Sequence, residues 1–151
     1  MIIAHALTDA NVDDATTGID LIEAVVDDIA RVTADAAYDT IAFYESAGAR
    51  AAQVVVPPAT TAAVSRRGPR SSARDRTIKQ VNEIGRRRWK KASGYHQQAR
   101  VENAFFRYKS IFGGALRARS PGGQVAEATV ACNVLNQMTD MGRPDSYAIG
   151  R

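Results

Sequence analysis

The sequence Tyr-His-Gln-Gln-Ala-Arg-Val-Glu-Asn-Ala-Phe-Phe-Arg-Tyr-Lys, from Tyr95 to Lys109, is the stretch around which the rest of the chain is organised. Its apolar residues recur with the i, i+3, i+4, i+7, i+11 spacing of an amphipathic helix, at Val101, Ala104, Phe105, Tyr108 and Phe112. This pattern predicts a helix with one buried stripe. Gly113-Gly114 predicts where that helix ends.

A second line of polar residues runs beside the stripe, through Gln98, Glu102 and Lys109, with Tyr95 just ahead of it. Glu102 and Lys109 are two helical turns apart, so they project in nearly the same direction at a separation of roughly 10 Å along the axis. Such a line is either a solvated helix face, where Glu and Lys are ordinary residues, or the edge of a functional site.

Length and composition indicate one domain, or a large part of one, with a real core: the chain has 151 residues, of which 45% are hydrophobic. No run approaches the roughly 18 apolar residues of a membrane span, and the N-terminus lacks the layout of a secretory signal. The single cysteine, Cys132, excludes an internal disulfide framework and fits a reducing cytoplasm. Its apolar helical surroundings predict a buried, inert thiol.

Charge is strongly segregated along the chain, although the net charge is only +4. Residues 1–65 hold ten acidic residues and two arginines, whereas residues 66–119 hold sixteen Lys or Arg and three acidic residues. A basic block of this density favours binding to a nucleic-acid backbone, although a solvated face or a flexible arm has the same composition. The candidate DNA contacts in the block are Arg86, Arg87, Arg88, Lys90 and Lys91.

A strand–helix–strand unit is predicted in the acidic half. Apolar runs at Ile29–Asp35 and Gln53–Val56 read as strands, and Asp39 is placed to cap the short helix between them. Short connections make the two strands parallel, with a right-handed crossover. Ligands of such sheets bind beyond the carboxyl ends of the strands, where Asp35 lies. Asp35 is therefore either a metal ligand or only a turn or capping residue.

The remaining segments are predicted more simply. Met1–Leu7 is apolar enough to be the end of a strand, and a helix is expected from the capping residues Asn11–Asp14 to about Asp28. Residues 57–74, rich in Pro, Thr, Ser and Arg, predict a flexible basic loop. Two further helices are predicted from apolar periodicity, one through Ile78, Val81 and Ile84 and one through Val125, Ala128, Cys132, Leu135 and Met138.

These pieces together resemble a known family. Asp35-Ala-Ala-Tyr-Asp-Thr40, after a strand, is similar to the second-aspartate motif of bacterial insertion-sequence DDE transposases. Tyr95-x2-Gln98-x3-Glu102-x6-Lys109 resembles their Y-x2-R-x3-E-x6-K signature, and the basic blocks between the two motifs stand in the family's order. The resemblance covers essentially the whole chain and identifies residues 1–151 as the C-terminal part of a DDE transposase catalytic domain.

The resemblance implies an α/β, RNase H-like fold in which three acidic residues hold two divalent metals, Mg²⁺ or Mn²⁺. Such a metal pair promotes in-line phosphoryl transfer during DNA cleavage and strand transfer. Asp35 would be the second acid and Glu102 the third, both of them metal ligands. Lys109 would lie near a DNA phosphate or base, and Tyr95 would stack on or hydrogen-bond to the strand. The implied partner is DNA at the ends of the element.

The sequence departs from the family pattern twice. Gln98 stands where the family has Arg, so a charged, forked phosphate contact becomes a neutral one. The chain also opens near what would be the third strand, so the first two strands and the first catalytic Asp are expected to be absent. The strand at Ile29–Asp35 would then have an unpaired edge, which favours pairing with another chain.

Two functional hypotheses follow from these departures. In the first, the chain is part of a transposase whose native activity, the cutting and joining of element ends, is lost here. In the second, it is a non-catalytic DNA-binding remnant that modulates an intact transposase or associates with itself through the exposed sheet edge. Under both hypotheses we expect a marginally folded protein.

Overall fold

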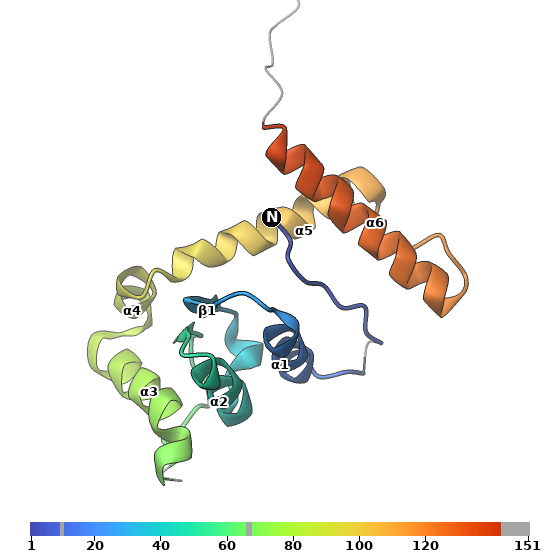
Figure 1. Cartoon of the computed structure of the whole chain (residues 1–151). Helices are drawn as coiled ribbons and strands as arrows, with labels where there is room; N and C mark the ends of the chain where they lie inside the picture. The colour runs from blue at the N-terminus through green and yellow to red at the C-terminus, as the bar shows by residue number, and fades with distance from the viewer. Residues whose placement is uncertain (10, 66–67, 143–151) are drawn as a thin grey trace, which may run out of the picture. The chain divides into compact units, whose positions relative to one another are not determined.

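A computed structural model describes residues 1–9, 11–65 and 68–142 (Figure 1). The chain divides into two compact units. We call Thr8–Glu102 the strand unit, because it holds both strands, and Met1–Leu7 together with the residues from Asn103 onward the terminal unit. In the described part of the chain the fold is mainly helical, with one small parallel sheet.

The sheet of the strand unit pairs β1 (Arg31–Thr33) with β2 (Gln53–Val55). The strands are parallel, with Val32 opposite Val54, which confirms the predicted orientation. Hydrogen bonds from Gln53 N to the Ala30 carbonyl, 3.0 Å, and from Ala34 N to the Val55 carbonyl, 3.3 Å, extend the pairing at its two ends. The strands therefore lie inside the predicted segments and are slightly shorter than them.

Two helices pack together beside this sheet, α1 (Asp14–Ala24) and α2 (Ile41–Ala49). A carbon atom added at Gly18 of α1 would lie 2.6 Å from the Tyr38 ring and 2.9 Å from the Phe43 ring, so glycine permits this close approach. The buried cluster draws on both helices, on the end of β1 and on the residue after β2, and comprises Ile22, Ala34, Phe43, Tyr44, Ala47 and Val56.

Helix α1 begins as predicted and ends about one turn early. The Asp13 carboxylate caps it by accepting from Thr16 N at 2.9 Å. The predicted end near Asp28 is wrong, because the backbone becomes extended at Val25. The Arg50 guanidinium accounts for this early end, since it donates to the carbonyls of Ile22 and Val25 at 3.0 and 2.8 Å and so satisfies groups that a longer helix would have bonded internally.

The residue that caps α2 differs from the prediction. Thr40, and not Asp39, is the N-cap, and its hydroxyl accepts from Phe43 N at 3.2 Å. Asp39 is buried and accepts from Arg74 through both carboxylate oxygens, each at 2.8 Å. The same carboxylate also accepts from Ala59 N at 2.9 Å. Leaving a buried carboxylate without a cation costs more free energy than a charged helix cap contributes. Asp39 therefore pairs with Arg74, and the neighbouring threonine caps the helix.

Residues 57–74, predicted as a flexible basic loop, include the short helix η2 (Gly68–Ser71) and the first turn of α3 (Ser72–Ile84). The Asp75 carboxylate accepts from Ser65 N at 3.0 Å and from the Ser71 hydroxyl at 2.7 Å, and these bonds hold the pKa of Asp75 below its ordinary value. How mobile the segment is stays a prediction.

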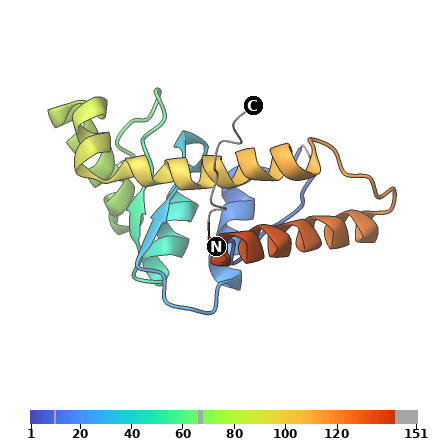
Figure 2. The same ribbon diagram turned by 90° about the horizontal axis from the view of Figure 1, so that it is seen from above.

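The terminal unit contains most of α5 (Ala99–Phe112) and all of α6 (Pro121–Asp140), joined by a loop that Figure 2 shows clearly. The Ser120 hydroxyl caps α6 by accepting from Gly123 N. The predicted buried stripe of α5 is wrong: none of the helix's residues, all of which the structure describes, is buried. Phe105, one of the aromatic residues of the stripe, is 63% exposed.

Met1–Leu7 was expected to end a strand, and this expectation is also wrong. The structure describes these residues in full and assigns them no strand. Ile2 instead pairs with the Asn136 side chain of α6: its N–H donates to Asn136 Oδ1 at 2.6 Å and its carbonyl accepts from Asn136 Nδ2 at 2.7 Å. The side-chain amide of one helix residue therefore takes the place of a neighbouring strand.

Of the predicted apolar face of α6, Cys132 and Leu135 are buried together with Ala131, whereas Val125 and Met138 are exposed. Burial raises the pKa of the Cys132 thiol, which agrees with the prediction of an unreactive cysteine.

Candidate functional site

Asp35 lies just beyond the carboxyl end of β1, as predicted. It is the N-cap of the short helix η1 (Ala36–Tyr38), and its Oδ1 accepts from Ala37 N at 2.8 Å. The capping role that the sequence left open is therefore real. The residue is nevertheless exposed, so the carboxylate at this edge of the sheet is accessible to a ligand.

A left-handed glycine brings a second segment to the same strand. Gly94, at φ 74°, follows α4 (Arg86–Ala92) and precedes the short helix η3 (Tyr95–Gln98). Residues other than glycine rarely adopt this backbone conformation. A carbon atom added at Gly94 would also lie 3.1 Å from Arg31 Nη1, and η3 packs against β1. The glycine therefore allows the turn that places Tyr95 near the sheet.

The pKa of Tyr95 is affected by the charges of both predicted acids. Its pKa is raised, first by partial burial and then by the negative charges of Asp35 and Glu102, while the positive charge of Arg86 opposes the shift. Electrostatic influence of this kind falls off steeply with distance. Two carboxylates that are far apart in the sequence therefore share the surroundings of one phenol, and all of these residues belong to the strand unit.

Glu102 and Gln98 approach this site from the start of α5. Glu102 is exposed in the first turn, where a negative charge interacts favourably with the helix dipole. The Oε1 atom of Gln98 is buried and has no hydrogen-bond partner among the described residues. An arginine at this position would have no acceptor atom to bury, so the family's usual residue would present different chemistry here.

Helix α4 carries five basic side chains, of which Lys90 contacts Tyr95. Trp89 is buried and anchors the helix, and Arg86 donates to the Pro58 carbonyl. Lys90 is partly buried, with its Nζ 4.6 Å from the centre of the Tyr95 ring. The other basic residues of the helix are exposed, namely Arg87, Arg88 and Lys91. A phosphate backbone beside Tyr95 would meet several cations.

Lys109 is exposed on α5, two turns beyond Glu102 on the same continuous helix. It falls in the part of that helix that belongs to the terminal unit. Asp35, Tyr95, Gln98 and Glu102 therefore belong to the strand unit, whereas Lys109 belongs to the terminal unit.

The oxygen ligands suit a divalent metal in kind but fall short in number. Carboxylate oxygens are the ligands that Mg²⁺ prefers, and such sites are often completed by water and substrate phosphate. Within the described ranges, however, no group of three His, Cys, Asp or Glu side chains is placed to hold a metal ion. Asp35 and Glu102 can thus provide part of a metal site, and the described residues do not complete it.

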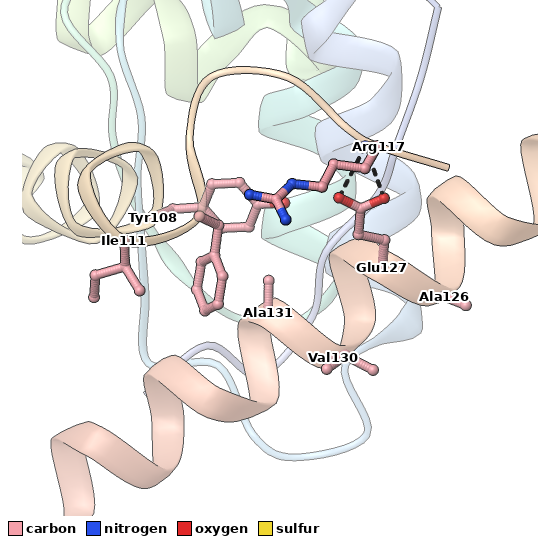
Figure 3. A pocket seen from close by; sticks show the side chains of 8 residues that line it. Tyr108, Ile111, Arg117, Ala126, Glu127, Val130 and Ala131 are labelled. Carbon is pink, nitrogen blue, oxygen red and sulfur yellow. Dashed lines mark hydrogen bonds between the residues drawn. The ribbon is translucent and has the colours of Figure 1, made fainter. Parts of the chain in front are cut away.

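A separate groove of about 420 Å³ lies in the terminal unit between the end of α5 and α6 (Figure 3). Glu127 stands at its rim, but its carboxylate accepts from the backbone N–H groups of Ala118, at 2.8 Å, and Arg117, at 3.0 Å. These bonds lower the pKa of Glu127, and through them the carboxylate stabilises the loop before α6. The other lining residues are mostly apolar, namely Tyr108, Ile111, Phe112, Ala126, Val130 and Ala131.

Comparison with known families identifies the family of the chain. A family model described as a transposase DDE domain matches residues 1–137, which include both acids and the whole segment from Tyr95 to Lys109. The chain belongs to this family. A transposase domain implies transposition, a form of DNA recombination, and the family generally uses divalent metal ions. No solved structure matches the chain.

Within the described residues of this transposase-family chain, no helix is both long and apolar enough to cross a membrane. Sequence reasoning missed the role of Gly94 in the site. A glycine between two helix-forming segments was the available signal, but its left-handed conformation and its approach to Arg31 depend on how η3 packs against β1.

Proposed function

We propose that this chain carries the second and third acids of a DDE transposase metal site, Asp35 and Glu102, on an incomplete RNase H-like fold. The observation that carries the proposal is Tyr95, whose pKa responds to both carboxylates while Lys90 lies over its ring. A site with two acids, an aromatic ring and adjacent cations has the chemistry needed to hold a DNA strand beside a metal. The proposed partner is DNA at the ends of an element, and the proposed location is the cytoplasm.

Each side chain has a defined part in this proposal. Mg²⁺ or Mn²⁺, when bound, would polarise the phosphate and activate the attacking hydroxyl. The exposed cations Arg87, Arg88 and Lys91 hold the phosphate backbone by charge. Tyr95 offers a ring on which a base can stack. Lys109 contacts the strand further along α5, and Gln98 supplies a neutral contact where the family has a charged one.

We infer that the chain binds DNA without cutting it. Asp35 and Glu102 supply two carboxylates, and in-line transfer between two metals in this family depends on three. No cleavage step is therefore derived for these residues alone. The second candidate function, a non-catalytic DNA-binding protein that modulates an intact transposase, is favoured by the exposed cations of α4. In the described residues β1 pairs with β2 alone, which leaves an edge for self-association.

The test combines binding and cleavage. Fluorescence anisotropy with a labelled DNA duplex, at about 50 and 200 mM salt, should show affinity that falls steeply with salt. Replacing Arg87 and Arg88 by alanine should weaken binding and flatten this dependence, whereas Glu102→Gln should leave binding in place. A supercoiled plasmid should stay intact in Mg²⁺ and in Mn²⁺. Nicking that Asp35→Ala or Glu102→Gln abolishes would instead establish an active nuclease.

A second measurement addresses the state of the fold. Thermal unfolding followed by circular dichroism, with the mass in solution determined in parallel, should show a broad transition or an associated species. A sharp, cooperative transition of a monomer would contradict the proposal that the fold is incomplete.

A further inference from the structure

Lys90 and Lys91 are neighbours in α4, but their surroundings differ. We propose that Lys90 is a positioning residue, which holds the Tyr95 ring in place for DNA, and that Lys91 is a direct phosphate contact. The inference rests on the proposed DNA-binding function and assigns separate roles to two lysines of the same basic cluster.

The geometry separates the two side chains. Lys90 Nζ lies 4.6 Å from the centre of the Tyr95 ring, within the range of a cation–π contact, and the residue is partly buried. Lys91 is exposed. Buried Trp89, the preceding residue, fixes the orientation of the helix, so the two lysines cannot exchange places by a small rotation. The Tyr95 ring occupies one side of the Lys90 ammonium group, so that group has fewer directions from which to meet a phosphate than the exposed Lys91.

Partial burial, the preceding turn and nearby charges also constrain Tyr95, and Lys90 adds a direct contact with its ring. Gly94 sets the turn that precedes it, at φ 74°, and η3 packs against β1. Asp35 and Glu102 place negative charge around the phenol. A base that stacks on Tyr95 would use the part of the ring that Lys90 leaves uncovered. Lys90 reduces the side-chain freedom that would otherwise be lost when DNA binds.

The contact itself can be tested in the free protein by NMR. The Hε protons of Lys90 should be shifted upfield by the ring current of Tyr95, while those of Lys91 should not. Tyr95→Leu should abolish the shift and Tyr95→Phe should preserve it. Unshifted Lys90 protons in the wild-type chain would overturn the inference, whether or not the protein binds DNA.

The role is tested by DNA binding, with a labelled duplex that carries a single-stranded 3′ extension. Lys91→Ala should lower the slope of log Kd against log salt by about one released counterion. Lys90→Met, which keeps the apolar stem, should weaken binding by about threefold with the slope unchanged. Lys90→Arg should restore affinity, because guanidinium also binds ring faces. Circular dichroism and Trp89 fluorescence verify that each variant is folded.

The double variant decides between positioning and direct contact. In the Tyr95→Leu background, Lys90→Met should have little further effect, because its action passes through the ring. A fully additive loss, or a drop in salt slope as large as that of Lys91→Ala, would overturn the positioning role. If the wild-type chain binds no DNA at any salt concentration, the proposed function fails, and the NMR measurement still decides the Lys90–Tyr95 contact.

Discussion

The strand unit and the terminal unit differ in how far they bury their apolar side chains and pair their charged ones. The strand unit buries large apolar residues such as Phe43 and Trp89 and pairs one of its buried carboxylates, Asp39, with Arg74. In the terminal unit the buried apolar residues described are all on α6, whereas α5 exposes Phe105 and Phe106, which are 63% and 70% accessible.

This difference shows where the candidate site obtains its rigidity. Asp35, Tyr95 and Glu102 all belong to the strand unit, whose core and polar contacts can hold side chains in defined positions. A functional site requires such support from the surrounding structure. The terminal unit presents apolar surface, which is typical of a region that is covered by another part of an assembly. The following experiments test this contrast, beginning with the largest expected effect.

Asp39→Ala should destabilise the strand unit by about 3 kcal/mol, because it leaves the Arg74 guanidinium without its buried partner. Trp89, the only tryptophan, is buried in this unit, so its fluorescence during urea unfolding measures the loss directly. Asp28→Ala, at an exposed position, is the control and should change stability little. Equal effects of the two substitutions would show that the Asp39 ion pair does not stabilise the unit.

Two glycines of the strand unit should respond to alanine with opposite signs. Gly18→Ala should cost about 2 kcal/mol, because the new methyl group would meet the rings of Tyr38 and Phe43. Gly48→Ala, in α2, meets nothing within 4 Å and should stabilise the protein by about 0.5 kcal/mol through helix propensity. Urea unfolding monitored by Trp89 distinguishes the two. A stabilising Gly18→Ala would mean that α1 and α2 are loosely packed.

In the terminal unit, Glu127→Gln should speed amide hydrogen exchange at Arg117 and Ala118, because a neutral amide is a weaker acceptor than a carboxylate. Since the folded pKa of Glu127 is lowered, its stabilisation is present above the unfolded pKa and is lost as pH falls through the folded value. Acidification of the wild-type chain should therefore lower the protection of these two amides, once their exchange rates are corrected for the intrinsic dependence of exchange on pH. Exchange that is insensitive to both changes would show that this loop is held by other contacts.

The smallest effect is expected at Phe106. Phe106→Ser should change the stability of the isolated chain by less than about 0.5 kcal/mol, because the ring is already exposed. Thermal unfolding at several protein concentrations measures this. A large loss, or one that depends on concentration, would show that a second copy of the chain covers the ring and that the terminal unit is less exposed than its structure alone indicates.

The positions of helices and strands were predicted better than the contacts that these helices and strands make. Apolar runs and glycine positions predicted the parallel strands, the helix between them and the last helix. This is because the periodicity of apolar residues indicates which face of a helix or strand is apolar. The buried stripe of α5 and the strand at Met1–Leu7 were wrong, because periodicity shows that a face is apolar and cannot show what covers it. The cap of α2 was assigned to Asp39 because its distant partner, Arg74, could not be inferred locally.

The sequence by itself determined the family, through the order of its motifs, and it determined which residues are acidic, basic or aromatic at the candidate site. Only the tertiary structure decided that partial burial and the charges of Asp35 and Glu102 raise the pKa of Tyr95, and that Lys90 lies over its ring while Lys91 is exposed. The physical reason is that motif spacing acts along the chain, whereas charges and ring contacts act through space. The turn at Gly94 and the packing of η3 against β1 connect the two.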